Sequence, residues 1–286
     1  MNDFKLCNVR KIVSTTHHYG YLNHNIDKKF GFVRISKSGS TSFTSCEKLG
    51  LNSYFKIKDY KNDIYAALRD PHARFLSSIP ETLSRIKCCS ENMKFPDRMN
   101  LNVSNDIVDL IENNNDKSPS EVFYLFIDII KNYGFFDAHH EPQYFFLTNI
   151  NSTCLNNIKI FNLNQSNEAA QEIYNKHFDS RKYNLPKSNS GLERTVPKMS
   201  FLKKIKQNKR ETLTNPYKNP MYRWGIKRKI PVEKIRPEFY RELKLKCSSS
   251  EARKELKKIY QIDYHLISQI GDKNIFHELI RNKSIT

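Results

Sequence analysis

The sequence predicts an α/β protein in which helices flank a central parallel sheet, and its 286 residues suit a single domain. Two observations support this prediction. Apolar runs at residues 30–35 and 64–68 have the length and composition of buried strands, and a turn with a helix start comes directly after each one. Strands that alternate with helices in this way pair in parallel, so we expect both runs in one sheet.

The first run lies in the stretch Gly31–Cys46, which reads GFVRISKSGSTSFTSC, and Ser36–Ser42 after it is too small and polar to continue the strand. Ser38–Ser42 offers backbone N–H groups and hydroxyls within a few residues, and Lys37 adds a positive charge. A helix predicted over Phe43–Leu49, ending at Gly50, would direct its positive end toward an anion. The stretch is either a phosphate-binding turn or an ordinary strand-to-helix connection, since the same residue types also cap helices.

The second run leads directly into Arg69, and Pro71 follows where a helix would begin. This is a second turn at the carboxyl edge of a strand that suits an anion. Neither turn matches an ATP-type P-loop, Gly-x-x-x-x-Gly-Lys-Ser/Thr, because Lys37 comes before Gly39. Arg69 also stands where an acidic metal-binding residue would be expected, which argues against a magnesium-dependent nucleotide hydrolase.

The remaining elements follow from capping and periodicity. Ser118 and Glu121 have the spacing of a capping box around Pro119. The apolar run behind them predicts a buried helix that ends at Tyr133. We further predict a polar surface excursion at 80–117, a strand at 158–163, a helix at 167–178, an irregular basic segment at 181–246 and a closing helix at 248–270. Whether the basic segment is ordered without a ligand stays open.

The composition bounds the function as well. The formal charge of +18 calls for a partner, and three kinds suit it: nucleic acid, an anionic cofactor or an acidic glycan. Six cysteines without a Cys-x-x-Cys pair indicate neither a metal centre nor a disulfide framework. No stretch has the apolar length of a signal peptide or a membrane span, so we expect a soluble, cytoplasmic protein.

Residues 36–42 and 69–77 together resemble the two cofactor motifs of the 3′-phosphoadenylyl-sulfate (PAPS)-dependent sulfotransferases, in particular the branch that sulfates carbohydrates. That family has Pro-Lys-x-Gly-Ser-Thr-Ser after its first strand and Arg-Asp-Pro-x-x-Arg-φ-x-Ser after a later one, where φ is apolar. This chain reads Ser-Lys-Ser-Gly-Ser-Thr-Ser and Arg-Asp-Pro-His-Ala-Arg-Phe-Leu-Ser, in the same order. Shorter similarities lie at 137–143, 185–190 and 259–264, so the resemblance spans about residues 30–266.

The resemblance implies a P-loop-like sheet in a core at about 30–180, and PAPS as sulfuryl donor without a metal. It implies that Lys37 lies near the bridging oxygen of the leaving group, and that Arg69 and Ser77 hold the 3′-phosphate. The 5′-phosphosulfate would be held by Lys37, Ser38, Gly39, Ser40, Thr41 and Ser42. The sulfuryl group would pass in line to a hydroxyl of a carbohydrate, an acidic glycan included. Fixed N–H donors and one lysine can stabilise such a transfer without a metal.

The general base is not settled by the resemblance. Ser36 replaces the proline of the family, and only the 26 residues 43–68 separate the two motifs, which leaves little room for an inserted catalytic histidine. A base must accept the proton of the acceptor hydroxyl, and histidine or a buried carboxylate suits this role. His139 is our first choice, followed by His140, His72 and Glu47. Arg74 is either a ligand contact or part of a helix-surface ion pair.

Two other hypotheses stay open. A basic nucleic-acid-binding protein would use residues 181–246 on phosphate backbones, and its binding would weaken steeply with salt. A catalytically inactive module with the sulfotransferase fold would bind the cofactor without transfer. On the sulfotransferase hypothesis we expect no nucleic-acid partner, and the acceptor pocket would be built from residues 80–117 and 181–246.

Overall fold

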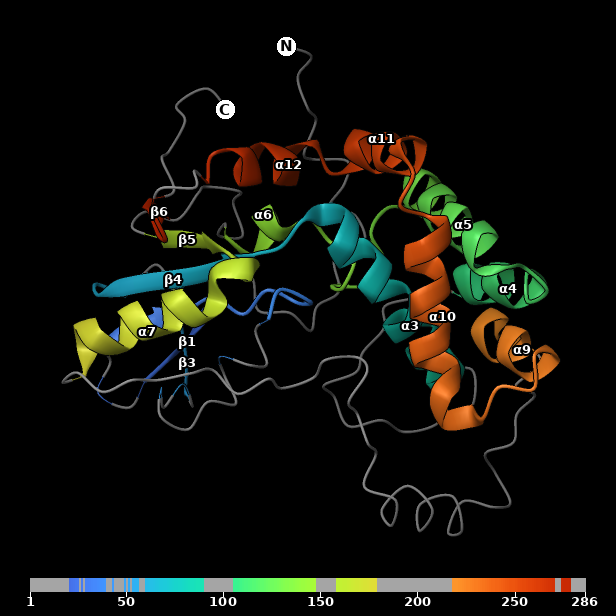
Figure 1. The fold of residues 1–286 in the computed structure, drawn as a ribbon, viewed down its shortest axis with the longest axis horizontal. Coiled ribbons are helices and arrows are strands. Elements are labelled where there is room, and N and C mark those ends of the chain that lie inside the picture. The colour runs from blue at the N-terminus through green and yellow to red at the C-terminus, as the bar shows by residue number, and fades with distance from the viewer. Residues whose placement is uncertain are drawn as a thin grey trace, which may run out of the picture. The chain divides into compact units, whose positions relative to one another are not determined.

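The computed structural model describes residues 21–25, 27, 29–39, 43, 49, 51, 53–56, 60–89, 105–147, 158–178, 218–270 and 274–278. The chain divides into two compact units (Figure 1). The sheet unit comprises His17–Arg74, Glu141–Asn189 and Tyr260–Thr286, and the helical unit takes in Phe75–His140 and Ser190–Ile259. A single domain stays a prediction, and we describe each unit by itself.

The sheet unit contains, among its described residues, six strands in the order β3-β1-β2-β4-β5-β6. The strands are β1 (Tyr21–His24), β2 (Phe30–Phe32), β3 (Ser53–Lys56), β4 (Asp63–Leu68), β5 (Ile158–Asn162) and β6 (His277–Glu278). β2, β4 and β5 are parallel, whereas β1, β3 and β6 join by antiparallel pairing. The predicted parallel sheet is therefore confirmed for the core strands, and the sheet as a whole is mixed.

A short connection explains why β1 and β2 run antiparallel. Parallel neighbours need a crossover of a dozen or more residues, and only residues 25–29 join these two strands. The side chain of Asn25 holds the turn, because its Oδ1 accepts hydrogen bonds from the backbone N–H of Lys29 at 2.7 Å and of Phe30 at 3.4 Å. A hairpin is the result.

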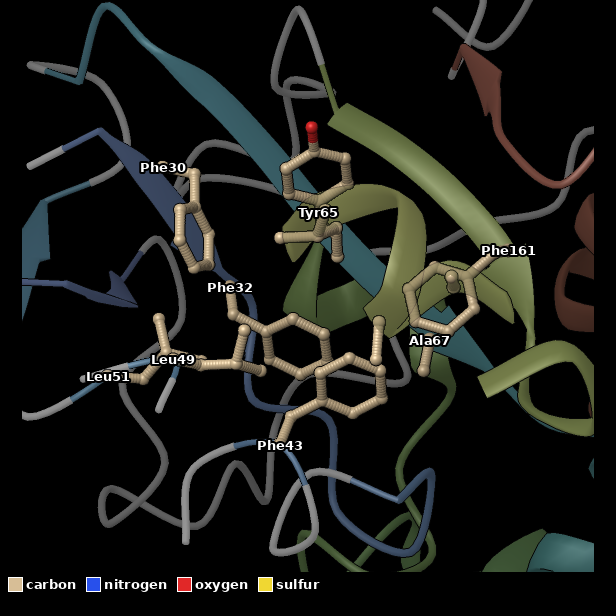
Figure 2. Close-up of a cluster of buried hydrophobic side chains, with 11 residues drawn as sticks. Phe30, Phe32, Phe43, Leu49, Leu51, Tyr65, Ala67 and Phe161 are labelled. Carbon is tan, nitrogen blue, oxygen red and sulfur yellow. The ribbon is translucent and has the colours of Figure 1, made fainter. Parts of the chain in front are cut away.

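One face of the sheet packs on α7 (Ser166–His177), which follows β5 through a short 3-10 turn, η5 (Leu163–Gln165). Figure 2 shows the buried cluster at this face, in which Phe32 stacks on Phe43 with ring centroids 4.5 Å apart. The cluster comprises Phe30, Phe32, Phe43, Leu49, Leu51, Tyr65, Ala67, Phe161, Ala169, Ala170 and Ile173. The predicted strand at 158–163 and helix at 167–178 are confirmed to within one residue.

The helical unit begins inside α3 (Pro71–Cys89), whose start at Pro71 is confirmed. It also contains α4 (Asn105–Asn113), α5 (Pro119–Tyr133), α9 (Pro220–Lys227), α10 (Val232–Lys246) and α11 (Ser250–Ile259). Within the unit, α10 packs on α5 and α9, and α11 on α5. The capping box of α5 is present, because Glu121 N–H donates to the Ser118 hydroxyl while Ser118 N–H donates to the Glu121 carboxylate.

Three predictions about this part of the chain are wrong. Residues 80–89 and 105–117, the described part of the predicted polar excursion at 80–117, are mostly helical: α3 continues to Cys89, and α4 buries Ile107 and Ile111. Residues 218–246 are not irregular, since they form α9 and α10. The closing helix is interrupted at Tyr260, which separates α11 from α12 (Gln261–Ser268). The break falls at the division between the two units.

Candidate functional site

The turn after β2 has an unusual backbone. Val33 N–H still donates to Tyr65 C=O at 2.8 Å, which extends the parallel pairing, and the chain then turns at residues 36–39. Lys37 has a φ of 62° and Gly39 a φ of 70°. The left-handed conformation costs a lysine about 1–2 kcal/mol, so the contacts around this turn must hold it.

Gly39 is required at its position for two reasons. Its φ of 70° is one that side chains rarely adopt, and a Cβ atom there would lie 2.4 Å from Cδ1 of Leu163. Leu163 opens η5, directly after β5. The turn after β2 therefore packs closely against the connection that follows β5.

The turn after β4 is joined to this first turn by one side-chain amide, that of Gln143 in α6 (Gln143–Phe146). Gln143 Oε1 accepts from the backbone N–H of Arg69 and from the Ser38 hydroxyl, each at 2.8 Å. Gln143 Nε2 donates to Arg69 C=O at 2.8 Å, and Arg69 Nη1 donates to Lys37 C=O at 3.1 Å. The two turns that the sequence indicated separately are thus held side by side.

Asp263 in α12 fixes the backbone that presents this amide. Its carboxylate accepts from Gln143 N–H at 2.8 Å and from Tyr144 N–H at 3.1 Å. Burial raises the pKa of Asp263, against the opposing effects of Arg74 and of the two N–H donors. A buried carboxylate with two backbone donors serves as an anchor for the start of α6.

Arg74 is buried, so the predicted helix-surface ion pair is wrong. Its side chain is 2 % exposed, its Nε donates to Ser36 C=O at 2.8 Å and its Nη1 donates to Glu141 C=O at 2.5 Å. Arg74 therefore ties the first turn to the segment that precedes Gln143. Both of these hydrogen bonds go to the chain's own backbone, which favours a structural role.

Asp70 explains the acidic position of the second motif. Its carboxylate accepts from Ala73 N–H at 2.8 Å, and its C=O accepts from Arg74 N–H at 2.9 Å. Asp70 is thus the residue that caps the first turn of α3, with Pro71 at the first helical position. A cap of this kind fixes where the helix starts and so where Arg69 ends β4.

His139, the predicted base, lies in the helical unit and pairs with Asp137. The His139 Nδ1 is 2.6 Å from Asp137 Oδ1, and the same oxygen accepts from His139 N–H at 2.8 Å. Asp137 Oδ2 also accepts from the Thr82 hydroxyl at 3.1 Å. A carboxylate on one ring nitrogen fixes the ring orientation, as a histidine base requires. The side chain of His139 is 9 % exposed.

The next two candidate bases are core residues. His140 is fully buried, with Nδ1 2.7 Å from the Ser78 hydroxyl and Nε2 2.8 Å from the Thr82 hydroxyl. Both ring nitrogens of His140 are therefore engaged, and its ring packs among aromatic side chains of the same unit. His72 is also buried, at 2 % exposure.

Ser77 lies on α3 and is partly buried. The predicted residues Ser40, Thr41, Ser42 and Glu47 lie outside the described residues, as does 185–190.

Gln143 and Asp263 were not predicted as site residues. The sequence could have indicated a buried role for Asp263. This acidic residue stands four positions after Ile259 and three before Leu266, on the apolar stripe of the predicted closing helix. A charge on a buried stripe points to a buried hydrogen-bond role. Gln143 is the last residue of the similarity at 137–143, which marked the segment without indicating what the amide does.

The site that results is cationic and lies at the carboxyl ends of two parallel strands, where open α/β sheets bind ligands. Lys37 and Arg69 supply the charge. Among the described residues, no group of three or more histidine, cysteine or acidic side chains is arranged to hold a metal ion, and no helix could cross a membrane. Compared with known proteins, the chain matches no family model, no curated protein and no solved structure.

Proposed function

We propose that the protein is a PAPS-dependent sulfotransferase that moves a sulfuryl group to a hydroxyl of a carbohydrate. The observation that supports this proposal is the Gln143 amide, which hydrogen-bonds to both Ser38 and Arg69. Two sequence motifs 26 residues apart thereby form one cationic edge. A donor with a phosphosulfate at one end and a 3′-phosphate at the other needs two such turns.

In this proposal the chain binds and orients the donor. Lys37 stabilises the charge that develops on the leaving phosphate oxygen, and the N–H groups of the turn, with Ser40–Ser42, hold the phosphosulfate. Arg69 and Ser77 bind the 3′-phosphate, where a guanidinium can form two parallel hydrogen bonds. The acceptor oxygen bonds to sulfur as the bond between sulfur and the phosphate oxygen breaks. The proton of the acceptor hydroxyl passes to the general base.

His139 stays the predicted base. The Asp137 carboxylate holds its Nδ1, so a proton would be taken at Nε2. The carbohydrate acceptor is taken from the resemblance, and the strongly basic chain suits an acidic glycan.

A thermal-shift titration with 3′-phosphoadenosine 5′-phosphate tests the proposal. A ligand at a hundred times its Kd stabilises a folded protein by about 2.7 kcal/mol, so the melting temperature of the parent should rise clearly. Lys37→Ala and Arg69→Ala should lose most of that rise. Lys257→Ala, on an exposed position of α11, is the matched control and should keep it.

Three outcomes separate the hypotheses. No stabilisation of the parent overturns the sulfotransferase proposal. Stabilisation without transfer of radiolabelled sulfate from PAPS to any hydroxyl acceptor indicates an inactive module. The nucleic-acid hypothesis is favoured by the basic helices α10 and α11, which expose Lys244, Lys246 and Lys257. It predicts oligonucleotide binding that weakens steeply with salt and does not respond to the nucleotide.

A further inference from the structure

A second candidate site lies at the opposite edge of the same sheet, where the parallel strands begin. A pocket of about 390 Å³ is lined there by Lys29, Lys61, Asn62, Asp63, Lys159, His177 and Glu278. Lys29 precedes β2, Asp63 opens β4, and His177 ends α7. Because the turns with Lys37 and Arg69 leave from the other ends of β2 and β4, this pocket is separate from the proposed donor site.

Asp63, one of the residues that line the pocket, already has several hydrogen-bond donors around its carboxylate. Asp63 lies 3.0 Å from Lys159 Nζ and 2.5 Å from Lys176 Nζ, and it accepts from the Tyr65 hydroxyl at 3.2 Å. Figure 2 shows the Tyr65 ring in the buried cluster with its hydroxyl directed away from the other labelled side chains. Burial alone would raise the pKa of Asp63, but hydrogen bonds from Lys176 and Lys159 lower it to about 2. Asp63 is therefore ionised at neutral pH and its charge is more than balanced.

Two further lysines at the pocket, Lys29 and Lys61, are not paired with a carboxylate among the described residues. Lys29 Nζ lies 3.4 Å from His177 C=O and 5.5 Å from the centre of the Phe178 ring, and Lys61 is exposed. Glu278, the remaining acidic residue of the lining, is exposed. Three lysines and two carboxylates thus line the cavity, and Lys176 adds a fourth ammonium group next to Asp63.

The histidine of the lining adds no charge at neutral pH. Burial lowers the pKa of His177, and the nearby ammonium groups of Lys176, Lys159 and Lys29 lower it further against the opposing effect of Asp63. His177 Nε2 lies 3.2 Å from the Tyr65 hydroxyl, so its Nδ1 is the ring nitrogen considered for a ligand, and the amide of Asn62 also lines the pocket. The pocket consequently offers mostly donors and a net positive charge, which suits a ligand rich in acceptors.

We propose that this pocket binds a phosphate or sulfate group carried by a small organic molecule of about monosaccharide size, with Lys29 and Lys61 as its principal ligands. An oxyanion of this kind accepts several charge-assisted hydrogen bonds at once, and lysines bind it as adaptable point charges. The cavity volume lies at the lower end of the range for small-molecule sites and exceeds what a bare ion fills. The proposal does not depend on the sulfotransferase activity.

Isothermal titration calorimetry with glucose 6-phosphate tests this proposal at fixed ionic strength. The parent should bind glucose 6-phosphate, and the double variant Lys29→Ala/Lys61→Ala should bind it at least tenfold more weakly. Uncharged glucose should give no heat of binding. Inorganic phosphate distinguishes the source of the anion: equal affinity means that a free anion is the ligand, and weaker binding means that the organic group contributes.

Two control variants make the result specific. Lys257→Ala removes an exposed lysine of the helical unit and should leave the affinity unchanged, as should Lys37→Ala at the other edge of the sheet. Absence of binding to the parent, or equal binding by the double variant, overturns the proposal. Loss of binding in Lys37→Ala alone also overturns it, because the anion then binds at the turns after the strands. Should the double variant not fold, Lys61→Glu alone serves, since that side chain is exposed.

Discussion

The two edges of the sheet hold their polar groups in different ways. At the carboxyl edge, Arg74, Gln143 and Asp263 are at most 2 % exposed and bond mainly to backbone groups. At the amino edge, the Asp63, Lys159 and Lys176 side chains are 23 %, 24 % and 50 % exposed and bond to one another as ions. Buried hydrogen bonds are costly to break, whereas exposed ion pairs contribute little. The first edge is therefore built to fix a backbone, and the second keeps charge accessible.

The largest effect is expected at Arg74. Arg74→Met removes the donors to Ser36 C=O and Glu141 C=O and leaves Asp263 without its nearby positive charge. Breaking a buried charge network in this way costs about 3–5 kcal/mol of the free energy of unfolding. Urea denaturation measures it, with Arg253→Met at an exposed position of α11 as the control. A loss below about 1 kcal/mol in Arg74→Met would contradict the structural role of this guanidinium.

Gln143 gives the next largest effect and links stability to the proposed donor site. Gln143→Ala deprives the Arg69 backbone and the buried Ser38 hydroxyl of their partner. Leaving such groups unsatisfied lowers the free energy of unfolding by about 3 kcal/mol in total, and the two turns lose the side chain that holds them together. We expect the thermal shift with 3′-phosphoadenosine 5′-phosphate to disappear as well. Gln261→Ala, at the exposed start of α12, is the control, and a parent-like shift in Gln143→Ala would show that the amide is not needed.

The contrast between local and distant contacts explains what the sequence could predict. β4, β5 and the capping box of α5 were predicted because alternation and capping are decided within a few residues. The two cationic turns were found for the same reason. The bond from Gln143 to Arg69 joins residues 74 positions apart, and that from Asp263 to Gln143 joins residues 120 apart. No local pattern encodes such a pair.

The basic segment shows a different kind of error. Residues 218–246 were judged by their lysines and arginines, yet α10 buries Ile235, Phe239 and Leu243 at intervals of four residues. That spacing is a helical stripe, and it was present in the sequence. The charged side chains on the outer face outnumber the apolar ones. A prediction based on composition therefore missed the helical spacing of the apolar residues. The antiparallel outer strands were missed because β1 and β6 are only four and two residues long.

The smallest effect, and the one that separates the two edges most directly, is on pH dependence. The folded-state pKa of Asp63 is about 2, below its ordinary value of 3.8, so its ion pairs stabilise the fold above pH 4 and lose that contribution between pH 4 and pH 2. Because these side chains are partly exposed, water screens the effect to about 1 kcal/mol. The stability difference between the parent and Asp63→Asn should shrink by this amount on acidification, and high salt should reduce it further.

Asp263 should titrate in the opposite sense. Burial raises its folded-state pKa above the unfolded value, so the folded protein binds the extra proton and its stability falls as pH rises from about 4 through the raised pKa. Urea denaturation at several pH values, on the parent and on Asp263→Asn, measures this slope. If the contributions of Asp263 and Asp63 to the pH dependence of the free energy of unfolding had the same sign, this difference between the two edges would be contradicted. Opposite signs would mean that burial governs the carboxyl edge and ion pairing governs the amino edge.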